Sequence, residues 1–249
     1  LHCGRYNKPS TQQSTRKLLE NEYLPKWSKR PIGEIERKDI IAILDAMIVR
    51  GSPGAANNAY AAISKFFNWC ASRDLIEMSP CTGITRPTRR NTRDRVLNDQ
   101  ELGKVWAAIS ETEYPYRNIV QLLILTGQRR GEVANMEWDH IDWDEKLWKL
   151  PDTITKNRRN HTLPLTKLSL DILNATPRIN DQHFVFPALG STETTFSGFS
   201  KCKRRLDEEV QIEEWRLHDL RRTAATGMAM LGTAPHVVER ILNHTSGTF

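Results

Sequence analysis

The feature that most restricts the fold is a basic stretch in the first half of the chain, TRPTRRNTRDR, from Thr85 to Arg95. It contains five arginines and no large apolar residue, so it cannot contribute to a hydrophobic core. Apolar-patterned sequence lies on both sides of it. We therefore expect two domains, residues 1–86 and 97–249, joined by an exposed linker at 87–96.

The charge of this stretch has two explanations. Most charge runs are simply solvated, but a basic linker between two domains can also lie along a phosphate backbone. The formal net charge of +6 favours a polyanionic partner. We favour the second explanation and predict DNA contacts at five arginines of the stretch: Arg86, Arg89, Arg90, Arg93 and Arg95.

The first domain is expected to be an all-helical bundle. Apolar residues recur with helical spacing over residues 15–27, 38–51 and 55–75. The third segment is rich in small and polar residues. These could allow close approach to DNA or could pack between helices, and the sequence leaves both explanations open for Ala55, Ala56, Asn57, Asn58 and Ser64.

The second domain is expected to be mixed α/β and mostly helical. Asn98 and Glu101 have the spacing of a capping box, and a second helix should stop at Gly127. Two β-compatible runs flank the polar turn KNRRN at 156–160, which indicates a small antiparallel hairpin. Helical patterns return at 197–210, 216–231 and 234–243. The fold class predicted for the whole chain is mainly α.

Several classes of function are disfavoured. The four cysteines are scattered, which argues against a zinc site or a disulfide scaffold and favours a reducing compartment, the cytoplasm. The acidic cluster DHIDWDE has no second acidic motif to complete a two-metal site. Glycine-rich phosphate loops, a signal peptide and a membrane span are not seen. We expect no metal, no cofactor and no membrane.

Two arginines occupy unusual positions in helical projections. In TGQRRGEVANMEW, Arg129 falls between the apolar Val133 and Met136, with Glu132 in reach. In LHDLRRTAATGMAML, Arg221 lies at the edge of the apolar stripe. Such positions are costly for a cation unless it is paired or faces an anion. A structural Arg129–Glu132 pair alone would explain the first of them.

Histidines accompany these arginines. His218 lies three residues before Arg221 on the same flank, and His244 follows near the end of the chain, whereas Arg222 projects away. Two guanidiniums present forks of donors that match phosphate oxygens, and a histidine can donate or transfer a proton near neutral pH. The combination predicts a phosphate site that works without a metal.

Four motifs in order, TGQRRGE, the lysine of TKNRRNHTLPL, HDLRR and LNH, resemble the catalytic domain of tyrosine recombinases of the phage-integrase type. The resemblance covers nearly the whole chain. It implies a SAM-like helical core-binding domain before the catalytic domain. It also implies site-specific DNA breakage and rejoining through a 3′-phosphotyrosyl intermediate, which integrates or excises a phage or mobile element.

The resemblance also assigns roles residue by residue. Arg129 and Arg221 match the arginines of the phosphate clamp, with Glu132 as the support of the first. Lys156, expected at a strand end entering the hairpin turn, matches a general acid for the leaving 5′ oxygen. His218 belongs to the H-x-x-R pair. The remaining residue, His244, matches the position that hydrogen-bonds the scissile phosphate.

The nucleophilic tyrosine of the family has no match here. Tyr114 and Tyr116, the last tyrosines of the sequence, match no nucleophilic position. We expect the tyrosine to lie outside these 249 residues, which should then bind DNA without cleaving it. Two alternatives stay open: a non-catalytic DNA-binding protein derived from a recombinase, and an enzyme of the type IB topoisomerase kind.

The expected partner is double-stranded DNA at core or attachment sites. The resemblance implies a homotetramer in the synaptic complex and accessory DNA-bending or excision proteins. Further phosphate contacts are predicted in the hairpin turn and in the basic cluster KCKRR, for which a solvated helix face is the alternative: Arg158, Arg159, Lys201, Lys203 and Arg204.

Overall fold

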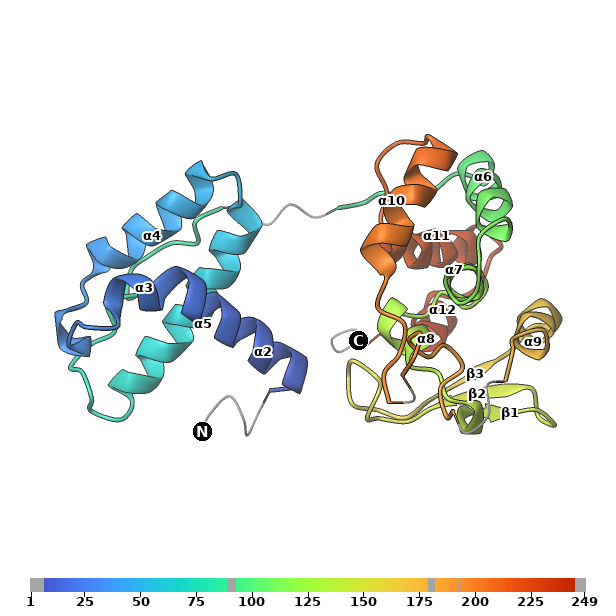
Figure 1. Cartoon of the computed structure of the whole chain (residues 1–249), viewed down its shortest axis with the longest axis horizontal. Coiled ribbons are helices and arrows are strands. Elements are labelled where there is room, and N and C mark those ends of the chain that lie inside the picture. Colours follow the sequence, from blue (N-terminus) through green and yellow to red (C-terminus); the bar gives the residue numbers. More distant parts are fainter. Residues whose placement is uncertain (1–6, 89–92, 179–181, 192, 245–249) are drawn as a thin grey trace. The chain divides into compact units, whose positions relative to one another are not determined.

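Three helical segments build the first of the two units into which the chain divides, residues 1–92 and 93–249 (Figure 1). The computed structural model describes residues 7–88, 93–178, 182–191 and 193–244. The first segment continues through α2 (Pro9–Leu18), the π-helical η1 (Leu19–Tyr23) and α3 (Leu24–Trp27). A short 3-10 turn, η2 (Ile32–Glu34), leads to α4 (Arg37–Val49), and α5 (Pro53–Ala71) follows.

Packing explains part of the small-residue pattern in α5. Ala56 and Ala59 are fully buried in the core of this unit, where α5 packs on α4. Asn57 exchanges hydrogen bonds with Thr88, accepting from its N–H (3.2 Å) and donating to its hydroxyl (2.7 Å). Ala56 and Asn57 are thus used within the unit, whereas Ala55 and Asn58 are exposed.

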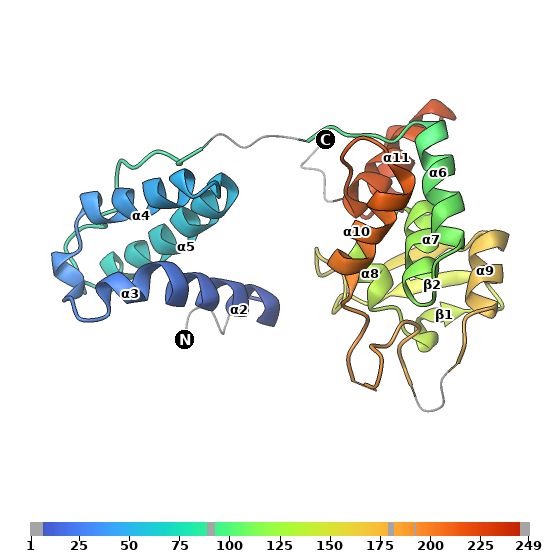
Figure 2. The same ribbon diagram turned by 45° about the horizontal axis from the view of Figure 1, so that its top comes forward.

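The second unit places helices on a three-stranded antiparallel sheet, with strand order β1-β2-β3 (Figure 2). Its core is centred on α7 and β2, where Ile119, Leu122 and Trp148 are fully buried. The elements are, in order, α6 (Asp99–Ser110), α7 (Tyr116–Thr126), α8 (Arg130–Ala134), η3 (Trp138–His140), β1 (Ile141–Asp142), β2 (Leu147–Leu150), β3 (His161–Pro164), α9 (Lys167–Asn174), α10 (Phe199–Val210), α11 (Leu217–Met230) and α12 (Pro235–Ile241).

Local signals in the sequence set two of these helix ends. Asn98 and Glu101 form the predicted capping box: Asn98 Oδ1 accepts from the Glu101 N–H (2.9 Å) and Glu101 Oε2 from the Asn98 N–H (3.0 Å). Gly127 ends α7 with φ of 63°, a left-handed conformation that glycine adopts without steric cost.

The hairpin has a longer connection than the sequence predicts. Strand β2 ends at Leu150 and β3 begins at His161, so Lys156 lies inside the loop 151–160 and not at a strand end. Pro151 has no N–H for the ladder, and its carbonyl accepts from the N–H groups of Ile154 (3.2 Å) and Thr155 (3.3 Å). This turn interrupts pairing and carries Lys156 away from the sheet.

Helix α12 also differs from its prediction. It ends at Ile241, and Asn243 adopts a left-handed φ of 48°, so the helix does not continue into His244. Within the described residues no helix is long and apolar enough to cross a membrane.

Candidate active site

The predicted site is gathered around the carbonyl groups at the end of α12 and directly after it. A helix ends with C=O groups that have no partner within the helix, and here side chains from other elements supply the donors. The Ile241 carbonyl accepts from Gln128 Nε2 (2.9 Å) and is bound by His161 Nε2 (3.0 Å). The Leu242 carbonyl accepts from Arg221. The Asn243 carbonyl accepts from Arg129 and Asn157, at 3.3 Å each. Arg129 and Arg221 thereby converge on the turn that leads to His244.

Arg129 lies directly before α8, and not within a helix as its sequence pattern predicts. Its φ of −73° and ψ of 144° are extended, and α8 begins at the next residue. The expected contact with Glu132 is present, because the Arg129 N–H donates to Glu132 Oε2 (3.0 Å) and the guanidinium to Oε1 (2.9 Å). Glu132 is only 2% exposed. One carboxylate therefore fixes both the backbone and the side chain of Arg129.

Arg221 is more deeply placed than the sequence indicates, with 3% of its surface exposed. Its Nη1 donates to the Gly127 carbonyl (2.8 Å) and its Nη2 to that of Leu242. Burial, and then the positive charge of Arg129, lower the pKa of Arg221 to about 10, so the group is still cationic at neutral pH. A buried cation beside a second cation is stabilised when an anion binds next to them. The two arginines therefore have the charge arrangement that a phosphate site requires.

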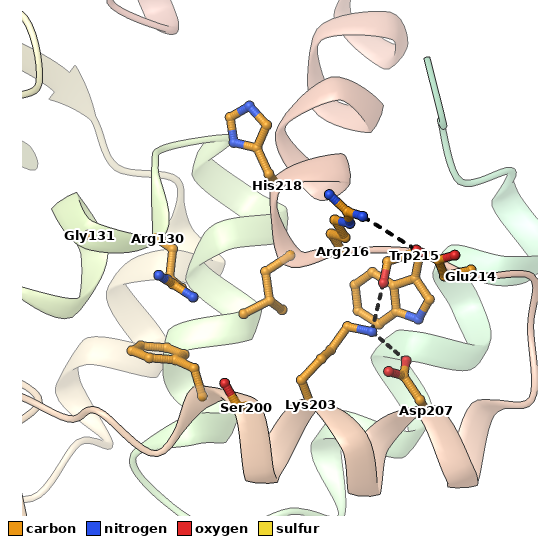
Figure 3. A pocket seen from close by; sticks show the side chains of 11 residues that line it. Arg130, Gly131, Ser200, Lys203, Asp207, Glu214, Trp215, Arg216 and His218 are labelled. Carbon is orange, nitrogen blue, oxygen red and sulfur yellow. Dashed lines mark hydrogen bonds and ion pairs between the residues drawn. The ribbon is translucent and has the colours of Figure 1, made fainter. Parts of the chain in front are cut away.

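His218, in the first turn of α11, lines a pocket of about 640 Å³ beside Arg130 and Arg216 (Figure 3). Partial burial, followed by the charges of Arg222 and Arg221, lowers the pKa of His218. The lowered pKa favours the neutral imidazole, which can accept a proton. Arg222 pairs instead with Asp219 (2.9 Å), which agrees with the projection that sets it apart from Arg221.

His244 and Lys156 lie on the turn after α12 and on the loop 151–160. The Nδ1 atom of His244 is 3.1 Å from a carboxylate oxygen of Glu239 in α12, and such a partner orients an imidazole ring. Lys156 is exposed, and its neighbour Asn157 binds Asn243, the residue before His244. The two elements that carry these candidates are thus in contact.

His161 is a member of the site that the sequence analysis missed. Its ring donates to the Ile241 carbonyl (3.0 Å). Burial lowers the pKa of His161, and the positive charges of Arg221 and Arg129 act in the same direction, against the raising effects of the Ile241 hydrogen bond and of Glu132. The signal in the sequence was weak, because a single histidine at the start of a strand is more often a packing residue.

The tyrosines of the second unit are unsuited to nucleophilic attack. Tyr116 is 3% exposed, and burial raises its pKa. The hydroxyl of Tyr114 donates to the Val185 carbonyl (2.8 Å), and burial raises its pKa to about 12. Both rings pack in the core of this unit.

Gly127→Ala is expected to destabilise the second unit by about 1–3 kcal/mol. A Cβ atom at Gly127 would lie 2.9 Å from Leu242 Cδ2 and 3.1 Å from Ala224 Cβ, at a φ that L residues rarely adopt. The matched control is Gly103→Ala in helix α6, where no atom beyond the adjacent residues and the helix's own backbone lies within 4 Å of the added Cβ and where alanine should stabilise by about 0.4–1 kcal/mol. Thermal unfolding measures both effects: the melting temperature should fall for Gly127→Ala and rise for Gly103→Ala. An unchanged melting temperature for Gly127→Ala would contradict the close packing around Gly127.

The predicted DNA contacts fall into three groups. Arg89 and Arg90 lie outside the described residues. Three of the others are bound within the second unit: Arg93 by Glu214 (3.0 Å) and Asp219 (3.1 Å), Arg95 by Glu101 (2.5 Å), and Lys203 by Asp207. The exposed residues are Arg86, Arg158, Arg159, Lys201 and Arg204.

Lys203 illustrates how the three bound residues differ from the exposed ones. Its ammonium lies 3.9 Å from the centre of the Trp215 ring and donates to the Trp215 carbonyl (2.9 Å) (Figure 3). Burial lowers its pKa against the raising effect of Asp207. Arg93, Arg95 and Lys203 hold elements of the unit together, a role that competes with the predicted contact to DNA.

Two family models match the chain. Residues 95–249 match the model described as phage integrase family, and residues 2–86 match the phage integrase central domain. Among the described residues, no group of histidine, cysteine and acidic side chains could hold a metal ion.

Curated relatives cover most of the chain. A shufflon-specific DNA recombinase of Escherichia coli is 27% identical over 217 residues, or 82% of this chain and 53% of that protein. Prophage integrase IntA of Escherichia coli K12 is 24% identical over 236 residues, or 91% and 56%. The chain thus spans about half the length of these relatives.

Solved structures share the fold. A lambda integrase dimer bound to a COC′ core site has a TM-score of 0.78 at 18% identity and covers 99% of this chain and 92% of its own. A lambda integrase tetramer bound to a Holliday junction also reaches 0.78 at 18% identity, with coverage of 99% and 74%. The predicted mainly helical fold with a small antiparallel sheet is confirmed.

Proposed function

Since the chain belongs to the phage integrase family, we propose that it is the DNA-binding and phosphate-activating part of a tyrosine site-specific recombinase that integrates or excises a phage or mobile element. Residues 1–86 would form the core-binding domain, and residues 97–249 the catalytic domain. The observation that carries the proposal is the pair of guanidiniums, Arg129 and Arg221, held at one turn by protein carbonyls.

The proposed reaction exchanges one phosphodiester for another. A tyrosine oxygen attacks the phosphorus, its proton passes to the neutral imidazole of His218, and the bond from phosphorus to the 5′ oxygen breaks. The leaving oxygen takes a proton from the Lys156 ammonium, so charge and protons balance without water or metal. Each guanidinium has five N–H donors, and the carbonyl and carboxylate bonds described above leave others for the phosphate oxygens. His244 would bind a further oxygen.

The tyrosine itself is proposed to lie outside the 249 residues. The burial of Tyr114 and Tyr116 supports this assignment. The partner would be core-site duplex DNA, and a homotetramer would form the synapse, in keeping with the dimer on a core site and the tetramer on a Holliday junction seen for lambda integrase. Accessory DNA-bending proteins would act on the same complex.

The test uses both the 249-residue chain and the full gene product. Duplexes that the chain retains from a randomised pool at 150 mM salt, about physiological ionic strength, identify a binding site. The full product should then form a denaturation-resistant covalent adduct with that site, whereas the 249 residues should bind it without forming one.

Three outcomes separate the alternatives. An adduct formed by the 249 residues alone would place the nucleophile within them. Tight binding without an adduct from the full gene product would favour the non-catalytic DNA-binding protein. Relaxation of supercoiled DNA without joining of two duplexes would favour a topoisomerase of type IB.

A further inference from the structure

A pair of asparagines links two segments of the site, the loop that carries Lys156 and the turn that carries His244. Asn157 Nδ2 donates to Asn243 Oδ1 (2.6 Å) and to the Asn243 carbonyl (3.3 Å). In return, Asn243 Nδ2 donates to Asn157 Oδ1 (3.3 Å). The two amides therefore pair reciprocally, which fixes both the separation and the orientation of the segments.

Asn243 sits where the backbone alone would favour glycine. Its φ of 48° is left-handed, a region that asparagine enters more readily than most residues but glycine at no steric cost. A glycine would satisfy the backbone and keep the carbonyl that accepts one bond from Asn157, but only an amide side chain can make the other two bonds. Those bonds are part-buried, where a lost amide partner costs more than at the surface.

Apart from the contact with Asn243, the loop 151–160 is held by hydrogen bonds between its own residues. Thr155 is fully buried, and its hydroxyl donates to the Arg159 carbonyl (2.9 Å) and accepts from the Arg159 N–H (3.1 Å). Asn160 Oδ1 accepts from the Asp152 N–H (2.9 Å). These bonds close the loop on itself, whereas Asn157 joins it to the turn before His244.

We infer that Asn157 and Asn243 are positioning residues that bring Lys156 to the phosphate at which His244 acts. This inference rests on the proposed function, because it assumes that Lys156 protonates the leaving oxygen. Adjacent residues have Cα atoms about 3.8 Å apart, so movement of Asn157 displaces Lys156. The pair couples Lys156, the proposed acid, to His244, the proposed phosphate ligand, because a movement of the turn before His244 would move the loop 151–160 with it.

The test compares two DNA substrates in single-turnover cleavage by the full gene product. One carries the ordinary 5′ oxygen at the scissile bond, and the other carries sulfur in its place. A thiolate is a far weaker base than an alkoxide and leaves without a proton donor. Asn157→Ala should slow cleavage of the oxygen substrate by about 10–100-fold, part of the 10²–10⁴-fold that a general acid supplies. Cleavage of the sulfur substrate should stay within about threefold of the parent, because no acid is required there.

Further variants separate positioning from folding. Lys156→Ala should show the same substrate dependence, and Lys156→Ala combined with Asn157→Ala should be no slower than Lys156→Ala alone, since both remove one function. Asn243→Gly, which keeps the backbone conformation, should behave like Asn157→Ala. The matched control is Asn160→Ala, which loosens the same loop without touching the His244 turn and should retain most activity on both substrates.

Two results would overturn the inference while leaving the proposed function in place. One is an Asn157→Ala variant that is equally slow on both substrates or not slow on either. The other is an Asn160→Ala defect equal to that of Asn157→Ala, which would assign the effect to loop integrity. A parent protein that cleaves neither substrate would overturn the proposed function and this inference with it.

Discussion

Arg221→Lys is expected to slow strand cleavage by the full gene product by about 10²–10³-fold, the usual cost of one preorganised donor to a developing oxyanion. Lysine keeps the charge but not the fork of donors that binds the Gly127 and Leu242 carbonyls and, in the proposed reaction, the phosphate as well. DNA affinity should change by less than about threefold, since many other basic residues are expected to contact the DNA backbone. Single-turnover cleavage and a binding titration at fixed salt measure the two effects.

The neighbouring arginine provides the matched control for this variant. Arg222 pairs with Asp219, so Arg222→Lys should leave cleavage within about threefold of the parent. The reverse result, with Arg222→Lys inactive and Arg221→Lys active, would mean that the wrong arginine of the pair has been assigned to the phosphate.

The sequence allowed the type of each element to be predicted better than its ends. Helical periodicity and the Asn98–Glu101 capping box were sufficient for α6, because the signals are local. The position of Arg129 was wrong in detail, since α8 begins one residue later and the helical projection had been extended into a turn. The conclusion that Arg129 needs a partner still held, because its charge lies beside a buried carboxylate in either geometry.

Contacts between distant residues could not be predicted in the same way. The exposed linker expected at 87–96 contains Arg93, which is bound by Glu214 and Asp219 of the second unit. The stretch 85–95 contains five arginines, and its composition does not show which of them meets a carboxylate more than one hundred residues away. His161 and the Asn157–Asn243 pair escaped notice for the same reason.

Glu132→Ala is expected to lower the free energy of unfolding of the second unit by about 3–5 kcal/mol, the cost of removing one partner of a buried ion pair. For a unit of this size the melting temperature should fall by roughly 10 °C. Glu132 is buried, accepts two hydrogen bonds from Arg129, and its charge also opposes the lowering of the pKa of Arg221. Its loss therefore leaves two neighbouring cations with one carboxylate fewer.

Two further substitutions distinguish charge from shape. Glu132→Gln keeps the side-chain volume and one acceptor, so it should cost only about 1–3 kcal/mol, and Glu145→Ala on an exposed turn should cost under about 0.5 kcal/mol. Equal losses for Glu132→Ala and Glu132→Gln would assign the effect to the carboxylate charge, and a loss from neither would contradict its role as the support of Arg129. Because the unbalanced cations are those proposed to bind the phosphate, added sulfate should raise the melting temperature of Glu132→Ala more than that of the parent. The charge arrangement that weakens the folded unit is then the same one that binds the anion.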